Sequence, residues 1–204
     1  MTSKPQALKA EPSSRGDLQR RKILNALHDC IIAKGYSKTT LRDVARKAGM
    51  SASHLLYYFP GKDAILEHYF QKVAEILMQR IEGFREQPPA QQIELLSDLF
   101  FAGKGLTRSE IGFMLECFGV AVHDQTLRKL KTELDRNNKA YLKDLFLSLA
   151  GHNEQFAEDA AEIAYAVLIG LRTAAYFDTQ LDLPQARRLF YNSIVNLANR
   201  APKS

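Results

Sequence analysis

The stretch MSASHLLYYFPGKDAIL, which begins at Met50, concentrates side chains that can form hydrogen bonds and ion pairs. Two serines, a histidine, two adjacent tyrosines and a phenylalanine fall within about two to three helical turns, and a lysine starts the next helix. A buried helix would not carry so much polar surface, and a helix that faces only water would not carry so many aromatic rings. The chemistry that this set suits is noncovalent recognition of a polar, charged partner.

The sequence does not contain the patterns that usually support catalysis. It has no Gly-rich phosphate loop, no GxSxG elbow and no HExxH pair. Cys30 and Cys117 stand in apolar helical patterns without CxxC or His/Cys spacing, which favours buried thiols in a reducing compartment over a disulfide or a zinc site. We therefore predict a protein that is not an enzyme, with no catalytic residues, no metal and no cofactor. An all-α enzyme whose site assembles across helices remains the alternative.

Positive charge gathers in the first third of the chain. Residues 1–66 hold 12 Lys and Arg against 5 Asp and Glu, a net charge of +7, whereas the whole chain of 204 residues carries +5. A basic segment joined to a slightly acidic remainder indicates a module that faces a polyanion. A solvated positive face without a partner is the alternative interpretation.

Hydrophobic residues recur at helical spacing along nearly the whole chain, and no segment alternates with period two for long enough to predict a strand. The expected fold class is therefore all-α. We expect a helix at 17–34 that ends at Gly35, a short helix at 41–48 capped by Thr39 or Thr40, and a third short helix that reaches Phe59. After Pro60 and Gly61, the pattern predicts helices at 62–84, 91–101, 109–122, 125–149, 155–176 and 184–199.

Residues 41–59 match a helix-turn-helix at its sterically critical places. Ala45 is small where the two helices cross, Gly49 suits the positive φ of the turn, and Leu55 anchors the second helix to the first. An ordinary helical hairpin is the alternative. In a helix-turn-helix the second helix lies in the DNA major groove, with its leading turn at the base edges and flanking groups on phosphates.

These considerations predict a DNA interface made of two kinds of group. Small polar residues at the start of the second helix approach the bases, while tyrosine hydroxyls and groups at helix N-termini reach phosphate oxygens. Lys62 is expected to be a phosphate clamp at the start of its helix. The predicted DNA-binding residues are Thr40, Arg42, Ser51, Ala52, Ser53, His54, Leu56, Tyr57, Tyr58 and Lys62.

The segment TTLRDVARKAGMSASHLLYYFPGKDAIL, residues 39–66, resembles the DNA-binding domain of the TetR family of transcriptional regulators. The family pattern is roughly TT-x-x-x-IA-x-x-AGVS-x-x-x-LY-aromatic-HF-x-x-K-x-x-L. Leu56 stands where a tyrosine is most common, Tyr58 replaces a frequent histidine, and Pro60 with Gly61 replaces a polar pair. These departures affect the expected base preference and leave the expected docking mode unchanged.

The resemblance implies the organisation of the rest of the chain. A helix-turn-helix DNA-binding domain (17–62) would be followed by a helical ligand-binding and dimerisation domain (63–204), and the polar opening residues themselves predict a disordered basic arm (1–16). The resemblance implies a homodimer that binds double-stranded DNA at a palindromic operator, acts as a repressor and is released by a small-molecule effector. The sequence itself, without a signal peptide or a membrane span, predicts a cytoplasmic protein. The broad apolar stripes of residues 160–176 and 189–197 suit a dimer interface, or equally the core of a monomeric bundle.

Apolar residues at helical spacing also suggest an effector pocket, although such residues more often form a plain core. The candidates are Phe100, Phe101, Phe113, Met114, Phe118 and His123, and Asp124 beside the histidine is equally able to cap the next helix. The opening residues lack the apolar core of a signal peptide, and the longest purely apolar stretches are shorter than the ~18 residues of a membrane span. We therefore expect no membrane partner. A nucleic-acid binder without sequence preference is the remaining alternative to a specific regulator.

Overall fold

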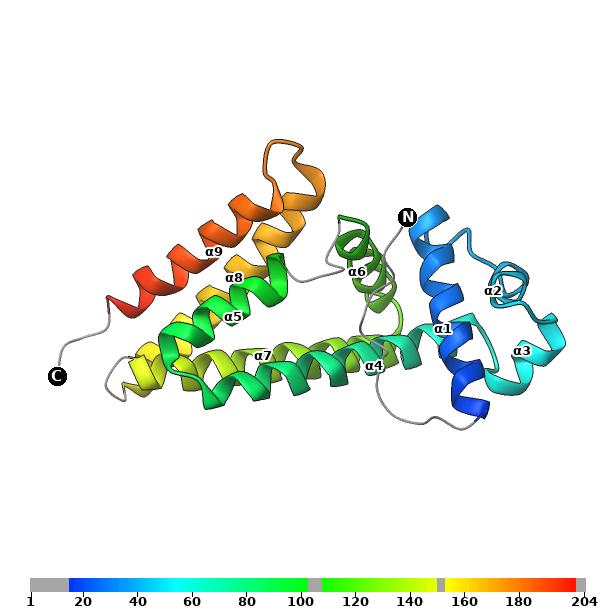
Figure 1. Cartoon of the computed structure of the whole chain (residues 1–204), viewed down its shortest axis with the longest axis horizontal. Helices are drawn as coiled ribbons and strands as arrows, with labels where there is room; N and C mark the ends of the chain where they lie inside the picture. The colour runs from blue at the N-terminus through cyan, green and yellow to red at the C-terminus, as the bar shows by residue number, and fades with distance from the viewer. Residues whose placement is uncertain (1–14, 103–107, 150–152, 201–204) are drawn as a thin grey trace. The chain divides into compact units, whose positions relative to one another are not determined.

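The computed structural model describes residues 15–102, 108–149 and 153–200. Within these ranges every regular element is helical, which confirms the predicted all-α class (Figure 1). The elements are α1 (Arg15–Lys34), α2 (Leu41–Ala48), α3 (Ala52–Tyr58), α4 (Lys62–Gly83), the 3₁₀ turn η2 (Phe84–Glu86), α5 (Pro89–Phe101), α6 (Arg108–Ala121), α7 (Gln125–Leu149), α8 (Glu154–Phe177) and α9 (Leu183–Ala198).

The helix boundaries lie within one or two residues of the expected ones because local capping groups set them. Gly35 has a left-handed φ of 81° and its N–H donates to the carbonyl of Ile31, which ends α1. Asn153 and Asp182 accept hydrogen bonds from backbone N–H groups in the first turns of α8 and α9. Of the predicted arm, Arg15 and Gly16 belong to α1, and residues 1–14 lie outside the described residues.

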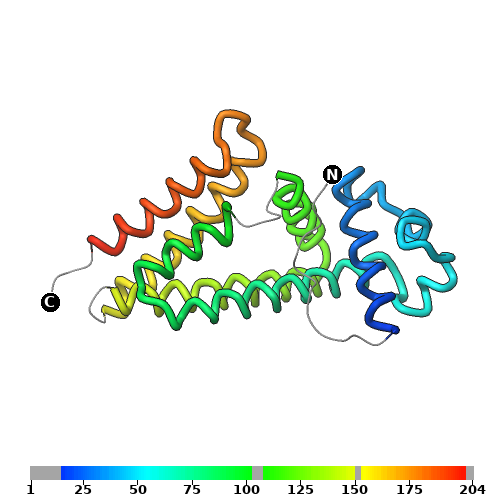
Figure 2. The backbone as a smooth tube through the Cα atoms, in the orientation of Figure 1, coloured from blue at the N-terminus to red at the C-terminus, as the bar shows by residue number. Residues whose placement is uncertain are grey.

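The described chain forms two compact units. The first comprises the residues up to Glu75 together with 112–131, and the second comprises 76–111 together with 132–200. The course of the backbone through α1, α2 and α3 into α4 can be followed in Figure 2. The proposed boundary between functional domains at residue 62 stays a prediction, but the packing does not follow it, since the start of α4 and most of α6 pack with the N-terminal helices.

The core of the first unit combines aliphatic and aromatic side chains. Ile23, Leu27 and Leu55 are fully buried. His28 of α1 is buried beside two aromatic rings, with centroid distances of 5.5 Å to Tyr69 and 4.7 Å to Phe113. The aromatic contact therefore joins α1, α4 and α6, and it accounts for the position of α6 in this unit.

The core of the second unit is built by α5, α7, α8 and α9. Phe101 and Phe190 pack with ring centroids 5.4 Å apart, and α9 packs against both α5 and α8. The hydroxyl of Tyr141 donates to Gln92 Oε1 over 2.6 Å, so both buried polar groups are paired. Small residues on α8 let its neighbours approach closely, and the buried alanines are Ala157, Ala160, Ala161, Ala164 and Ala175.

Among the described helices, α8 has the length and composition that could cross a membrane, with 24 residues and a mean hydropathy of 1.3 over its most apolar window. Core helices of globular proteins have the same character. The alanine-rich face of α8 is buried within the second unit, and about a third of that window is buried overall.

Candidate DNA interface

The N-terminus of α2 is organised around the carboxylate of Asp43. The Thr40 hydroxyl accepts a hydrogen bond from the Asp43 N–H (3.2 Å), and the Asp43 carboxylate accepts one from the Thr40 N–H (3.0 Å). Lys34 Nζ and Arg46 Nη2 lie 2.5 Å and 2.8 Å from the same carboxylate. The hydrogen bond from Lys34, followed by those from Thr40, holds the pKa of Asp43 well below its usual range. Thr40 is thus the helix cap, and Arg42 is exposed on the same helix.

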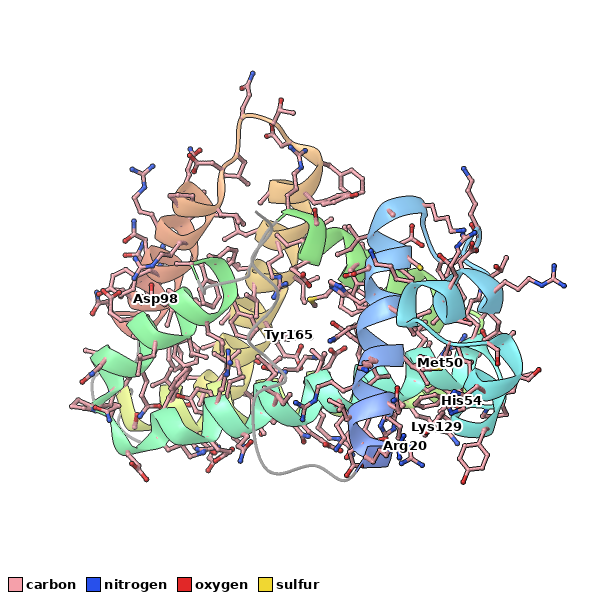
Figure 3. All side chains as sticks on the ribbon, turned by 45° about the vertical axis from the view of Figure 1, so that its right-hand side comes forward. Arg20, Met50, His54, Asp98, Lys129 and Tyr165 are labelled. Carbon is pink, nitrogen blue, oxygen red and sulfur yellow. The ribbon has the colours of Figure 1, made fainter. Side chains whose placement is uncertain are left out.

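The turn between α2 and α3 has the backbone geometry that the sequence predicts. Gly49 adopts a φ of 73°, and its N–H and that of Met50 donate to carbonyls of the last turn of α2. Ser51 then caps α3, because its hydroxyl accepts a hydrogen bond from the His54 N–H over 3.1 Å. Figure 3 shows Met50 at this turn and His54 on α3. A short loop therefore fixes the direction in which α3 leaves α2.

One face of α3 holds the helix to its unit, and the other faces outward. Leu55 is fully buried against the first unit, whereas Leu56 is 49% exposed and Tyr57 is 82% exposed. Ser53 and His54 are exposed as well. The outward face thus combines hydroxyls, an imidazole and apolar surface, which are the groups that read base edges and contact sugars in the major groove.

The aromatic side chains of α3 contact one another, and they are joined by an arginine that the sequence patterns did not single out. The ring of Tyr58 lies 5.4 Å from His54 and 5.2 Å from Tyr57, measured between centroids. The guanidinium of Arg20 on α1 lies 5.8 Å from the Tyr58 ring centroid, which is within range of a cation–π contact. The sequence signal for Arg20 was limited to the basic residues that surround it in α1.

The ammonium group of Lys62, predicted to bind a DNA phosphate, is engaged within the chain. Its Nζ donates to the backbone carbonyls of Tyr36 (2.9 Å) and Thr39 (3.0 Å), and it lies 3.9 Å from the Tyr36 ring centroid. Burial lowers the pKa of this lysine. The structure therefore places Lys62 at the start of α4, as expected, but turns its charge toward the segment between α1 and α2.

The residues expected to line an effector pocket fall into both units. Phe100 and Phe101 are buried in the second unit, while Phe113, Met114, Phe118 and His123 belong to the first. His123 is exposed, and Asp124 caps α7 by accepting a hydrogen bond from the Leu127 N–H over 2.8 Å. For this pair the capping interpretation is therefore the one that the structure shows. The pocket itself stays a prediction.

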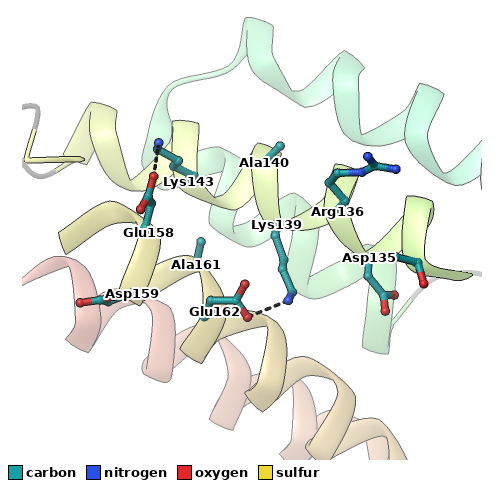
Figure 4. Close-up of a pocket in the computed structure, with 10 residues that line it drawn as sticks. Asp135, Arg136, Lys139, Ala140, Lys143, Glu158, Asp159, Ala161 and Glu162 are labelled. Atoms are coloured by element: carbon teal, nitrogen blue, oxygen red, sulfur yellow. Dashed lines mark hydrogen bonds and ion pairs between the residues drawn. The ribbon is translucent and has the colours of Figure 1, made fainter. Parts of the chain in front are cut away.

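A groove of about 620 Å³ lies between α7 and α8 in the second unit (Figure 4). Ion pairs cross it, including Lys139 to Glu162 and Lys143 to Glu158, each at 2.7 Å. Its lining residues are Thr132, Asp135, Arg136, Lys139, Ala140, Lys143, Glu158, Asp159, Ala161 and Glu162. The sequence patterns did not indicate this groove, because it forms only where the faces of two helices meet.

Two family models match the chain. One, described as bacterial regulatory proteins of the tetR family, matches residues 23–69. The other, described as the C-terminal part of BetI-type transcriptional repressors, matches residues 89–198, more than half of the chain. Together with the helix-turn-helix geometry, these matches show that the chain belongs to the TetR family of DNA-binding transcriptional regulators. Within that family, its C-terminal part is similar to the BetI type.

Individual relatives agree with this assignment. The transcriptional regulator BetI 1 of Chromohalobacter salexigens is 26% identical over 181 residues, which are 87% of this chain and 89% of that protein. RutR of Escherichia coli K12 is 34% identical over 68 residues, about a third of each chain.

Solved structures show the same fold. A transcriptional regulator from Rhodococcus sp. Rha1 has a TM-score of 0.79 and 18% identity, with 91% of this chain and 98% of that chain covered. A regulator from Saccharomonospora viridis in complex with choline has a TM-score of 0.76 and 20% identity, with 88% and 96% covered. The predicted division into an N-terminal helix-turn-helix and C-terminal helices is therefore that of known regulators.

Proposed function

We propose that this regulator is a homodimeric repressor that reads a palindromic operator with α3 and is released by a small-molecule effector. The observation that carries the proposal is the outward face of α3, where Tyr57 is 82% exposed while Leu55 on the opposite face is fully buried. A helix anchored on one side and polar and aromatic on the other is suited to insertion into the major groove.

The DNA contacts divide into base-reading and phosphate-binding roles. We assign base reading to Ser53, His54 and Leu56, since the first two carry hydrogen-bonding groups and the third can contact a thymine methyl group. Phosphate contacts are assigned to Arg42 and to the hydroxyl of Tyr57, with Arg42 supplying a full positive charge. Thr40 and Ser51 are the N-caps of α2 and α3, and Ala52 is the first residue of α3. The ring of Tyr58 packs against those of His54 and Tyr57.

A dimer interface is supported by the outer faces of α8 and α9, which pack side by side in the second unit. On α8, Ile163 is 49% exposed and Phe177 is 69% exposed, and Gly170 between them leaves open space. On α9, Leu189 is exposed. An apolar strip of this kind on two adjacent helices suits a symmetric contact with a second copy, which would place two α3 helices in successive major grooves about 34 Å apart.

Choline is the first effector to test, because it is bound in the Saccharomonospora viridis regulator and because the C-terminal part matches the BetI type. Two of the aromatic rings in the expected pocket already face cations of this chain. Arg172 lies 5.8 Å from the Phe100 ring centroid, and Lys131 Nζ lies 4.5 Å from that of Phe118. A quaternary ammonium ligand would therefore bind against other rings.

The proposal assigns no catalytic step, metal or cofactor to the chain, and it places the protein in the cytoplasm, where bacterial DNA lies. The test is selection of the purified protein against a random duplex library at near-physiological salt, followed by sequencing of the bound DNA. Enrichment of an inverted repeat is expected. Binding without enrichment would replace a specific regulator with a phosphate-only binder, and enrichment of a single half-site would contradict the dimer.

The second step measures binding of the enriched duplex with and without choline. Weaker binding with choline is expected for an effector that prefers the released conformation, and linkage requires that DNA weaken choline binding by the same factor. Unchanged affinity would remove choline as the effector without affecting the operator result.

A further inference from the structure

Tyr36 lies in the segment between α1 and α2 and contacts two further helices of the same unit. Its backbone N–H donates to Glu116 Oε2 on α6 over 3.0 Å. Its hydroxyl donates to the Asp63 carboxylate at the start of α4, and burial, followed by this hydrogen bond, raises the pKa of the phenol. Tyr36, which lies just before the helix-turn-helix, is thus hydrogen-bonded to both α4 and α6.

Lys62 provides a third contact with the segment around Tyr36. Its ammonium group bridges the carbonyls of Tyr36 and Thr39 and lies against the Tyr36 ring. Two of its three N–H groups are therefore used within the chain. Because the Thr39 carbonyl directly precedes the cap residue of α2, Lys62 holds the point from which α2 and then α3 depart.

The approach of Glu116 depends on the glycine before Tyr36. Gly35 has a left-handed φ of 81°, and a Cβ at this position would lie 3.1 Å from Glu116 Oε1. The glycine therefore both permits the turn and leaves room for the carboxylate. We call Gly35, Tyr36, Lys62, Asp63 and Glu116 the Tyr36 clasp.

We propose that Lys62 and Glu116 are positioning residues, which hold the helix-turn-helix through the Tyr36 clasp without touching DNA. The proposal rests on the proposed function, since it concerns the way in which α3 is held for DNA binding. Under this proposal, Lys62 contacts backbone carbonyls of its own chain instead of a DNA phosphate. Glu116 of α6 contacts the segment that directly precedes the DNA-reading helices. Three expected pocket residues, Phe113, Met114 and Phe118, lie on the same helix as Glu116.

The first test measures operator affinity of Lys62→Met as a function of salt, with the inverted repeat enriched from the random library as the probe. A lost phosphate contact would reduce the slope of log K against log salt by about 0.9. Loss of the clasp is expected to weaken binding about ten-fold at every salt concentration with an unchanged slope. Arg42→Ala, at a predicted phosphate contact, is the comparison variant whose slope should fall.

If Lys62→Met does not fold, as judged by circular dichroism, Lys62→Arg keeps the question open to experiment. Arginine retains the charge, so a phosphate contact would survive with nearly wild-type affinity. The planar guanidinium is larger than an ammonium group and directs its N–H donors differently, so the clasp predicts weaker binding with an unchanged slope. A reduced slope in Lys62→Met, or wild-type affinity in Lys62→Arg, would overturn the positioning role of Lys62.

The second test uses the direction in which operator affinity changes when the carboxylate of Glu116 is removed. Removal of an acidic group near a DNA-binding surface ordinarily strengthens DNA binding, because it reduces repulsion of phosphates. The clasp predicts that Glu116→Ala weakens operator binding about three- to ten-fold, since the Tyr36 N–H loses its acceptor. Glu116→Gln keeps an acceptor oxygen and is expected to bind at least as tightly as the wild type.

The matched control is Glu75→Ala, which removes the same charge from an exposed position on α4 whose partner is Lys72. It is expected to bind DNA with wild-type affinity or slightly more tightly. Tighter binding by Glu116→Ala, or equal effects of the alanine and glutamine variants, would overturn the role of Glu116. Enrichment of an operator by the wild-type protein is scored separately, so failure of the clasp and failure of the proposed function give different results.

Discussion

Replacement of Gly49 by alanine tests whether the turn of the helix-turn-helix depends on a left-handed glycine. Gly49 has a φ of 73°, and nothing lies within 4 Å of a Cβ built at this position. Any loss of stability in Gly49→Ala therefore comes from the backbone conformation and not from a steric clash of the added methyl group. A left-handed conformation costs a residue with a side chain about 1–2 kcal/mol, and alanine returns about 0.4–1 kcal/mol by restricting the unfolded chain. We expect the free energy of unfolding to fall by about 1 kcal/mol.

Urea denaturation followed by circular dichroism measures this change, and two glycines provide comparisons. Gly35→Ala meets the same strain at a φ of 81° and in addition displaces the Glu116 carboxylate, so it should lose operator affinity beyond its loss of stability. Gly83 lies at the end of α4, with a helical φ of −61° and open space around it. Its replacement by alanine should stabilise the protein by up to about 1 kcal/mol.

The two alanine variants are expected to change the free energy of unfolding in opposite directions, with a loss at Gly49 and a gain at Gly83. If Gly49→Ala were as stable as the wild type, the left-handed turn would not be a constraint on the helix-turn-helix. If Gly83→Ala lost as much stability as Gly49→Ala, the effect would come from alanine in general rather than from the sign of φ.

Leu55→Ala should lower the free energy of unfolding by about 2–5 kcal/mol, because a fully buried side chain leaves a cavity, and an exposed control such as Leu56→Ala should change it by less than about 0.5 kcal/mol. Tyr57→Ala should leave stability unchanged but weaken operator binding, as measured by fluorescence anisotropy; unchanged binding would remove Tyr57 from the interface. Asp43 has a folded pKa below its ordinary value of 3.8, so its stabilising effect is fully present above that pH and is lost as the pH falls through and below it. Asp43→Asn should therefore be less stable than the wild type at neutral pH, with the difference shrinking in acid; a constant difference in urea denaturation would contradict the ion-pair interpretation. Phe177→Asp should convert the proposed dimer to monomers in sedimentation experiments, and a persistent dimer would place the interface elsewhere.

The helix boundaries and the helix-turn-helix could be predicted from the sequence because both depend on neighbouring residues. Gly35 and Gly49 end their helices through their own backbone geometry, and Thr40 and Ser51 cap the helices that directly follow them. The alternation of a buried Leu55 with outward-facing neighbours follows from the helical period. Such interactions span a few residues, so they are encoded in short segments of sequence.

The tertiary structure alone decided which side chains meet across the fold. The direction of the Lys62 ammonium depends on a segment more than twenty residues earlier, and the carboxylate that binds the Tyr36 N–H lies 80 residues later. The expected pocket residues share a helical pattern but belong to two different units, because periodicity shows which face of a helix is apolar and not which helix packs against it. The sequence by itself therefore determined the class of protein and the helix that we propose reads DNA. How that helix is held was decided by packing between distant segments, whose contacts depend on the arrangement of the helices.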